Sequence, residues 1–137
     1  MKYWLLKSEP SAYSWDRLVA DKRTEWSGVR NYQAANNLKA MQAGDRAFFY
    51  HSGAGPEVVG VAEIVKAAYP DPSDKTGRFV MVDVKPVMPV KTPVTLAAMK
   101  AEPKLKDLVL VRQGRLSVSP VSAAEWRVIA GMAGVKA

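Results

Sequence analysis

The chain has 137 residues, a length that suits one domain, and 48% of them are hydrophobic against 24% charged, which is ordinary globular usage. It contains no Cys and one His, so a disulfide framework, a thiolate nucleophile and a zinc site with two His are excluded. Lys and Arg number 20 against 13 Asp and Glu, and the net charge of +7 favours an anionic partner, nucleic acid first.

The first ten residues do not have the pattern of a signal peptide. Their apolar run extends only from Tyr3 to Leu6 and is followed at once by charge. No segment approaches the ~18 apolar residues of a membrane-spanning helix. We therefore expect one soluble, cytoplasmic domain over residues 1–137, with no membrane partner.

The first third of the chain predicts a strand over residues 3–7 and two helices. The first helix, over 15–20, follows a Ser14 cap, and its predicted core face carries Trp15, Leu18 and Val19. The second helix, over 33–41, follows an Asn31 cap and has three residues at core spacing, Ala34, Leu38 and Met41. The segment between the helices, residues 21–28, is polar apart from Trp26 and predicts a loop.

The middle of the chain predicts a hairpin followed by a third strand. Aromatic residues mark a strand over 46–51, the Gly-rich segment 52–56 is a turn, and a Val- and Ile-rich strand follows over 57–68. Residues 70–77 predict a loop. The alternation over 79–87 predicts a half-exposed strand.

The last part of the chain predicts a short helix from Thr95 and short strands over 108–112 and 116–119. Ser122 and Glu125 form a capping box, with Val121 and Trp126 at the two positions of a hydrophobic staple, so a final helix is predicted over 123–133. Strands dominate and do not alternate with helices. We therefore predict an α+β fold, a curled antiparallel β-barrel with short helices around it.

The segment from Thr24 to Tyr32 carries the most informative pattern. Trp26 stands among polar residues, where a flat indole suits the stacking of a planar base. The amide of Asn31 offers a donor and an acceptor for a base edge. A Trp that closes the open end of a barrel explains the residue equally well, and spacing alone does not separate the two interpretations.

Other patterns support catalysis poorly. Gly53–Gly55 precedes a proline and a strand, whereas a phosphate-binding loop needs free amides at a helix start. His51, the one histidine, ends an aromatic strand, as a hydrogen-bonded structural residue or as a polar contact at a pocket mouth. The remaining alternatives are an enzyme that uses His51 with Asp71 or Glu9, and a small-molecule or protein-interaction adaptor whose basic surface is incidental.

Six segments together resemble the EVE domain, a family of the PUA-like superfamily. In chain order they are Tyr3–Pro10, Trp26–Ala34, Phe48–Ser52, Val59–Ile64, Ala68–Pro72 and Arg115–Val121. The EVE domain is itself similar to the YTH domain, which holds a methylated adenine of RNA in an aromatic cage. The resemblance implies a curled β-barrel with a pocket on one side, and a reader of modified bases in DNA or RNA with no cofactor or metal.

The resemblance also implies a base-binding pocket. Trp26 would be its stacking wall, with Tyr69 as a second aromatic wall and Phe79 in reserve. Arg115 and Ser117 would approach the base or its phosphate. The full predicted set is Lys7, Ser8, Trp26, Ser27, Val29, Arg30, Asn31, Tyr50, His51, Ser52, Tyr69, Phe79, Arg115, Leu116 and Ser117. We expect a monomer with modest affinity, steep salt dependence and modest selectivity for a modified base.

Overall fold

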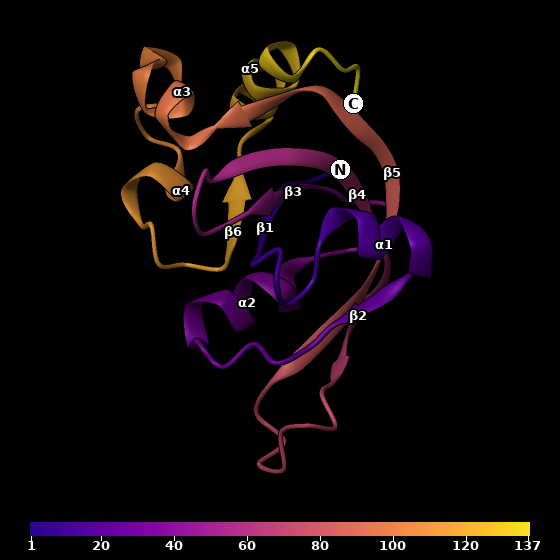
Figure 1. Ribbon diagram of the computed structural model, residues 1–137. Coiled ribbons are helices and arrows are strands. Elements are labelled where there is room, and N and C mark those ends of the chain that lie inside the picture. Colours follow the sequence, from indigo (N-terminus) through magenta and orange to yellow (C-terminus); the bar gives the residue numbers. More distant parts are fainter.

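A computed structural model describes residues 1–137 and shows one six-stranded sheet with short helices packed around it (Figure 1). The elements in chain order are β1 (Tyr3–Ser8), α1 (Trp15–Asp21), β2 (Thr24–Trp26), α2 (Tyr32–Ala40), β3 (Arg46–His51), β4 (Glu57–Pro70), β5 (Val80–Thr95), α3 (Leu96–Ala101), the 3₁₀ turn η1 (Pro103–Leu105), α4 (Val109–Arg112), β6 (Val118–Val121) and α5 (Ala123–Ala133). The predicted mixed α+β class is confirmed.

The strand order is β2-β5-β4-β3-β1-β6. Strands β1 and β3 pair in parallel, and the other neighbours pair antiparallel, so the prediction of a wholly antiparallel sheet was wrong at that one pair. Parallel neighbours require a long crossover, and the chain supplies it through α1, β2 and α2. The order has two ends, β2 and β6, so strand pairing does not close this sheet into the expected barrel.

Two hydrophobic cores lie on the two faces of the sheet. The alternation along β3 divides them: Phe49 belongs to the core with α1 and α2, and Phe48 and Tyr50 belong to the core with α3–α5. Because both faces are covered, the central strands β1 and β3 read as nearly continuous apolar runs. In Figure 1, α3 and α5 lie at one end of the molecule, and α2 and the tip of the β4–β5 hairpin lie at the other.

The predicted helix starts agree with the cap residues seen in the structure. The side chains of Ser14, Asn31 and Thr95 each accept a backbone hydrogen bond at the start of α1, α2 and α3, and Ser122 and Glu125 form the expected capping box of α5. Val19 was wrongly assigned to the core: it is 49% exposed, because the seven-residue helix α1 presents only a narrow stripe inward. None of the helices is both long and apolar enough to cross a membrane.

Three local predictions need correction. The predicted loop over 21–28 contains the edge strand β2, which pairs with β5. The predicted strand over 108–112 is the helix α4, since a short apolar run fits a buried helix turn as well as a strand, and Leu110 is buried in the second core. Strand β5 was expected to be half-exposed, but both of its faces are covered from Met81 to Val84, where Asp83 is buried beside Arg23.

Candidate functional site

One cavity of about 650 Å³ opens where the carboxyl end of β1 meets the edge strand β2 and the loop that leads into α2. Its lining comes from segments that are distant in sequence: Lys7, Ser8, Glu9, Tyr13, Thr24, Glu25, Trp26, Ser27, Gly28, Val29, Arg30, Asn31 and Ser117. We call this cavity the Trp26 pocket. Its volume is in the range of small-ligand sites, and its lining combines charged and amide side chains with two aromatic residues, Tyr13 and Trp26.

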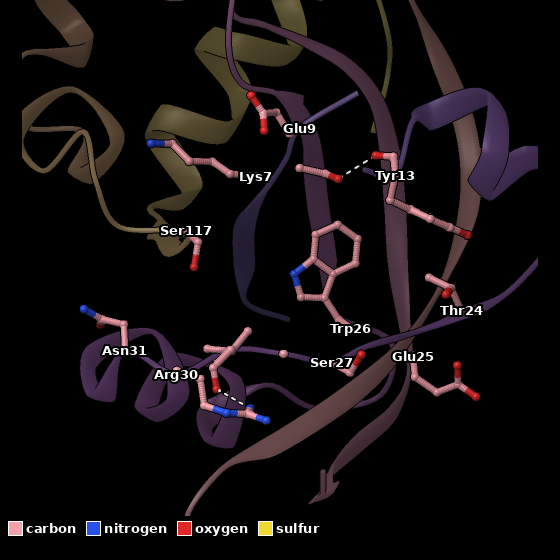
Figure 2. Close-up of a pocket in the computed structure, with 13 residues that line it drawn as sticks. Lys7, Glu9, Tyr13, Thr24, Glu25, Trp26, Ser27, Arg30, Asn31 and Ser117 are labelled. Atoms are coloured by element: carbon pink, nitrogen blue, oxygen red, sulfur yellow. Dashed lines mark hydrogen bonds between the residues drawn. The ribbon is translucent and has the colours of Figure 1, made fainter. Parts of the chain in front are cut away.

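Trp26 is half-buried and stands within the pocket. Its ring meets Phe49 edge-on, with centroids 5.6 Å apart and planes at 89°, so the sheet holds the indole from behind. Figure 2 shows the ring nitrogen on the side that faces Ser117 and Lys7. The indole nitrogens of Trp4 and Trp126 donate to acceptors in the chain, but no acceptor in the chain takes the hydrogen of Trp26 Nε1. Trp26 therefore offers a ring and a free donor to the cavity.

The loop after Trp26 is held by one buried carboxylate. Asp71 Oδ2 accepts hydrogen bonds from Gly28 N at 2.8 Å and from Arg30 Nη1 at 3.3 Å, and its Oδ1 accepts from Ser73 N and Oγ at 2.9 and 2.6 Å. Burial alone would raise the pKa of Asp71, but these hydrogen bonds lower the pKa to about 2. Gly28 has a φ of +79°, a left-handed conformation that favours glycine at this turn of the loop.

Lys7 and Ser117 form the opposite rim. Lys7 N donates to Ser117 O at 2.9 Å, and Lys7 Nζ donates to the carbonyl of Gly114. Burial lowers the pKa of Lys7, because desolvation disfavours the ammonium form. The hydroxyl of Ser8 is already engaged, since it donates to Tyr13 O at 2.5 Å. The donors on this rim are thus mostly engaged in hydrogen bonds to backbone carbonyls of the chain itself.

Asn31 does two things at the pocket edge. Its Oδ1 accepts from Ala34 N at 2.9 Å and caps α2, so its amide NH₂ is the part left for a ligand. Five further residues line the pocket and were not in the predicted set: Glu9, Tyr13, Thr24, Glu25 and Gly28. The alternation of β2 carried the signal for Thr24, which is two residues before Trp26, but the segment was interpreted as a loop.

The structure brings eight of the predicted residues together in the Trp26 pocket and leaves seven outside its lining. The eight are Lys7, Ser8, Trp26, Ser27, Val29, Arg30, Asn31 and Ser117. The seven are Tyr50, His51, Ser52, Tyr69, Phe79, Arg115 and Leu116. Tyr50 is buried in the second core, on the far face of the sheet from Trp26, and Leu116 is buried in the first.

The two residues proposed as a second aromatic wall lie elsewhere. Tyr69 on β4 donates its hydroxyl hydrogen to Asp83 on β5, and this hydrogen bond raises the pKa of Tyr69 to about 12. Lys66 Nζ lies 4.0 Å from the Tyr69 ring centroid. Phe79 is buried and packs against Tyr32 and Arg30. The lining of the pocket therefore contains Tyr13 and Trp26 as its aromatic residues.

His51 is directed at α1. Its Nε2 accepts a hydrogen bond from Trp15 N at 3.0 Å, and burial lowers its pKa, so the imidazole is neutral and its acceptor nitrogen is engaged. Both oxygens of Asp71 are engaged with the loop residues named above, and no hydrogen bond joins His51 to Asp71 or Glu9. No three His, Asp or Glu side chains are grouped in a way that could hold a metal ion.

Comparison with known proteins shows the family to which this chain belongs. The family model of the EVE domain matches residues 2–132. Human thymocyte nuclear protein 1 is 37% identical over 158 residues, which covers 90% of this chain and 70% of that protein. The solved structure of Rpa0253 from Rhodopseudomonas palustris is 55% identical, with a TM-score of 0.93 over 98% of this chain and 94% of that one. The chain belongs to the EVE domain family.

Two further solved structures bear on the predicted resemblance. The human THYN1 protein in complex with 5-methylcytosine-containing DNA is 34% identical and superposes with a TM-score of 0.91 over the whole of both chains. A YTH domain, from Zygosaccharomyces rouxii MRB1 in complex with N6-methyladenosine RNA, superposes with a TM-score of 0.61 at 17% identity, over 96% of this chain and 86% of that one. The second likeness concerns the fold alone. The predicted resemblance to the EVE domain is confirmed, and so is the likeness of the fold to that of a YTH domain.

Proposed function

We propose that this chain is a non-enzymatic nucleic-acid-binding module that takes one modified base, methylated or hydroxymethylated, from a DNA or RNA strand into the Trp26 pocket. The observation that carries the proposal is the half-buried indole of Trp26, fixed by Phe49 behind it and open toward a cavity of about 650 Å³. An aromatic ring beside an open cavity is the surface on which a planar base stacks, at ~1–3 kcal/mol per base.

The polar groups around Trp26 suit a base edge. The free Nε1–H of the indole and the amide NH₂ of Asn31 are donors, and the exposed Ser27 hydroxyl both donates and accepts. Donors of this kind match the carbonyl oxygen and ring nitrogen of cytosine, or the ring nitrogens of adenine. The human THYN1 structure, which aligns with this chain over its full length, is a complex with 5-methylcytosine-containing DNA and supports the same chemistry here.

The energetics call for contacts outside the pocket. Extruding a base from a duplex costs a few kcal/mol, which is comparable to what stacking returns. A methyl group that fills an apolar gap adds ~1–3 kcal/mol of discrimination. Phosphate contacts from a chain of net charge +7 supply the rest and make binding depend steeply on salt.

The position of His51 favours binding over catalysis. It lies outside the pocket lining and its acceptor nitrogen is engaged by Trp15, so the one histidine is not placed to act as a general base in the Trp26 pocket.

The test is a titration of Trp26→Ala and Trp26→Phe against oligonucleotides that differ in one base. Fluorescence anisotropy would follow DNA and RNA strands that carry 5-methylcytosine, 5-hydroxymethylcytosine or N6-methyladenine, each beside its unmodified twin. We expect wild type to prefer one modified strand, Trp26→Phe to keep part of that preference, and Trp26→Ala to lose it while its circular dichroism stays native. An unchanged preference in Trp26→Ala would refute the proposal.

The same titrations separate the alternatives. Binding that ignores salt concentration would favour an adaptor with an incidental basic surface. Conversion of a modified strand to a product, lost in His51→Ala, would favour an enzyme.

A further inference from the structure

A cluster of two aromatic and two arginine side chains lies beside the Trp26 pocket. The ring of Tyr32 packs on that of Phe79, with centroids 5.3 Å apart and an interplanar angle of 34°. Arg78 Nη1 donates to the Tyr32 hydroxyl at 3.4 Å, and the guanidinium carbon of Arg30 lies 5.4 Å from the Phe79 ring centroid. We call Arg30, Tyr32, Arg78 and Phe79 the Tyr32 cluster.

Tyr32 is more exposed than the fold requires. It is 63% exposed, although it is a large aromatic residue held by neighbours on two sides. It begins α2, whose core contacts come from later residues such as Ala34 and Leu38, so burial in the core does not account for an aromatic side chain here. One ring face rests near Phe79, and the high exposure leaves much of the ring surface available to a flat partner.

Arg78 supplies a positive charge that the chain does not neutralise. No carboxylate lies within 4.0 Å of its guanidinium, whereas Arg30 is paired with Asp71 at 3.3 Å. The backbone of Arg78 is fixed, because its N–H donates to Asp74 Oδ2 at 3.0 Å. A positioned arginine without an acidic partner is suited to a phosphate.

Arg30 connects the cluster to the pocket. It lines the Trp26 pocket, and its guanidinium carbon is 5.4 Å from the Phe79 ring centroid, which in turn is 5.3 Å from that of Tyr32. Tyr32 is therefore linked to the pocket wall through two successive contacts. That separation corresponds to about one to three nucleotide steps, at ~3.4 Å per step along a strand of B-DNA. The strand that delivers a base to Trp26 can therefore pass over Tyr32.

We propose that Tyr32 and Arg78 form a second contact site for the nucleic acid, which holds a nucleotide flanking the base in the Trp26 pocket. The Tyr32 ring stacks on the flanking base, and the Arg78 guanidinium binds its phosphate. This inference rests on the proposed function and adds a role for the loop between β4 and β5, which carries Arg78. The site recognises strand and phosphate, so it strengthens binding without regard to the modification.

The experiment compares Tyr32→Ala and Arg78→Gln with wild type on a single-stranded DNA nonamer with one central 5-methylcytosine and on its unmodified twin. Arg127→Gln, the same substitution at an exposed position on α5, is the matched control, and Trp26→Ala is included. Anisotropy is measured at several salt concentrations. Circular dichroism checks that each variant keeps the native fold, which we expect for Tyr32, Arg78 and Arg127 because their side chains are exposed.

We expect Tyr32→Ala and Arg78→Gln to weaken binding of both strands about 5–10-fold and to leave their affinity ratio unchanged, because a flanking contact does not report the modification. Arg78→Gln lowers the slope of log affinity against log salt by about 1, whereas Tyr32→Ala leaves it unchanged. Affinities within twofold of Arg127→Gln for both variants would overturn the inference. An affinity ratio that Trp26→Ala fails to change would overturn the proposed function instead, so the two failures are distinguishable.

Discussion

Replacing Asp71 with Asn should test whether one buried carboxylate holds the wall of the Trp26 pocket. Its side chain is fully buried and accepts hydrogen bonds from Gly28, Arg30 and Ser73. An amide presents one oxygen and one NH₂ group, so at least one of these donors would then face another donor. The substitution is nearly isosteric, and its effect therefore reports hydrogen bonding and charge more than packing.

Two routes give the magnitude. Leaving a buried donor unsatisfied costs about 1–3 kcal/mol. The pKa of Asp71 falls from its usual 3.8 to about 2, and at 1.36 kcal/mol per pKa unit this corresponds to about 2 kcal/mol of folding free energy. We therefore expect Asp71→Asn to lower the free energy of unfolding by about 2 kcal/mol at pH 7. Binding of the modified strand should weaken as well, because Gly28 and Arg30 lose their anchor.

Urea denaturation at several pH values is the assay, with the exposed Asp107→Asn as matched control, for which we expect less than about 0.5 kcal/mol. Because the folded-state pKa of Asp71 is depressed, its contribution is complete above pH 4–5 and is lost as pH falls through about 2. The difference between wild type and Asp71→Asn should thus shrink by roughly half at pH 3. A difference that stays constant with pH, or one no larger than that of the control, would refute this account.

Three further outcomes follow from local geometry. Asn31→Ser should keep the cap of α2 and remove the amide from the pocket, so binding weakens at unchanged melting temperature, whereas Asn31→Ala should also cost about 1 kcal/mol in thermal unfolding. Gly60→Ala should destabilise the fold by about 1–3 kcal/mol in urea, because the added Cβ would lie 2.5 Å from Trp15; a neutral change would show that the indole moves freely. Burial lowers the pKa of His51, so stability should decline as pH falls below about 6.5, and His51→Gln should flatten that decline; equal profiles would argue against the Trp15 contact.

The elements that the sequence predicted well are those whose signals are local. The capping box at Ser122 and the cap at Asn31 place helix starts because a side chain satisfies amides only three residues away. The parallel pairing of β1 with β3 has no such signal. It depends on where a crossover of two helices and an edge strand returns the chain, and an antiparallel neighbour would have had the same apolar pattern.

The site divides in the same way. The polar setting of Trp26 left a base pocket and a barrel plug equally open, and the resemblance to the EVE domain decided for the pocket. The five residues predicted from this segment, Trp26, Ser27, Val29, Arg30 and Asn31, all line the cavity. Tyr69 was chosen because it precedes the loop at Pro70, but the register of β4 with β5 directs its hydroxyl to Asp83. Which side chains from other strands face Trp26 is set by register, and register is not visible in a single sequence.

Two parts of the chain hold the Trp26 pocket in place, the sheet and the loop between β4 and β5. The sheet supports the indole through Phe49 and through the pairing of β2 with β5. The loop between β4 and β5, residues 71–79, fixes the loop after Trp26 through Asp71. The same β4–β5 loop also carries Phe79, on which the exposed ring of Tyr32 rests. One short segment thus positions both the pocket loop and the proposed flanking site. Changes at Lys75, in the middle of that loop, should be tolerated, while changes at its two ends, Asp71 and Phe79, should weaken both contacts together.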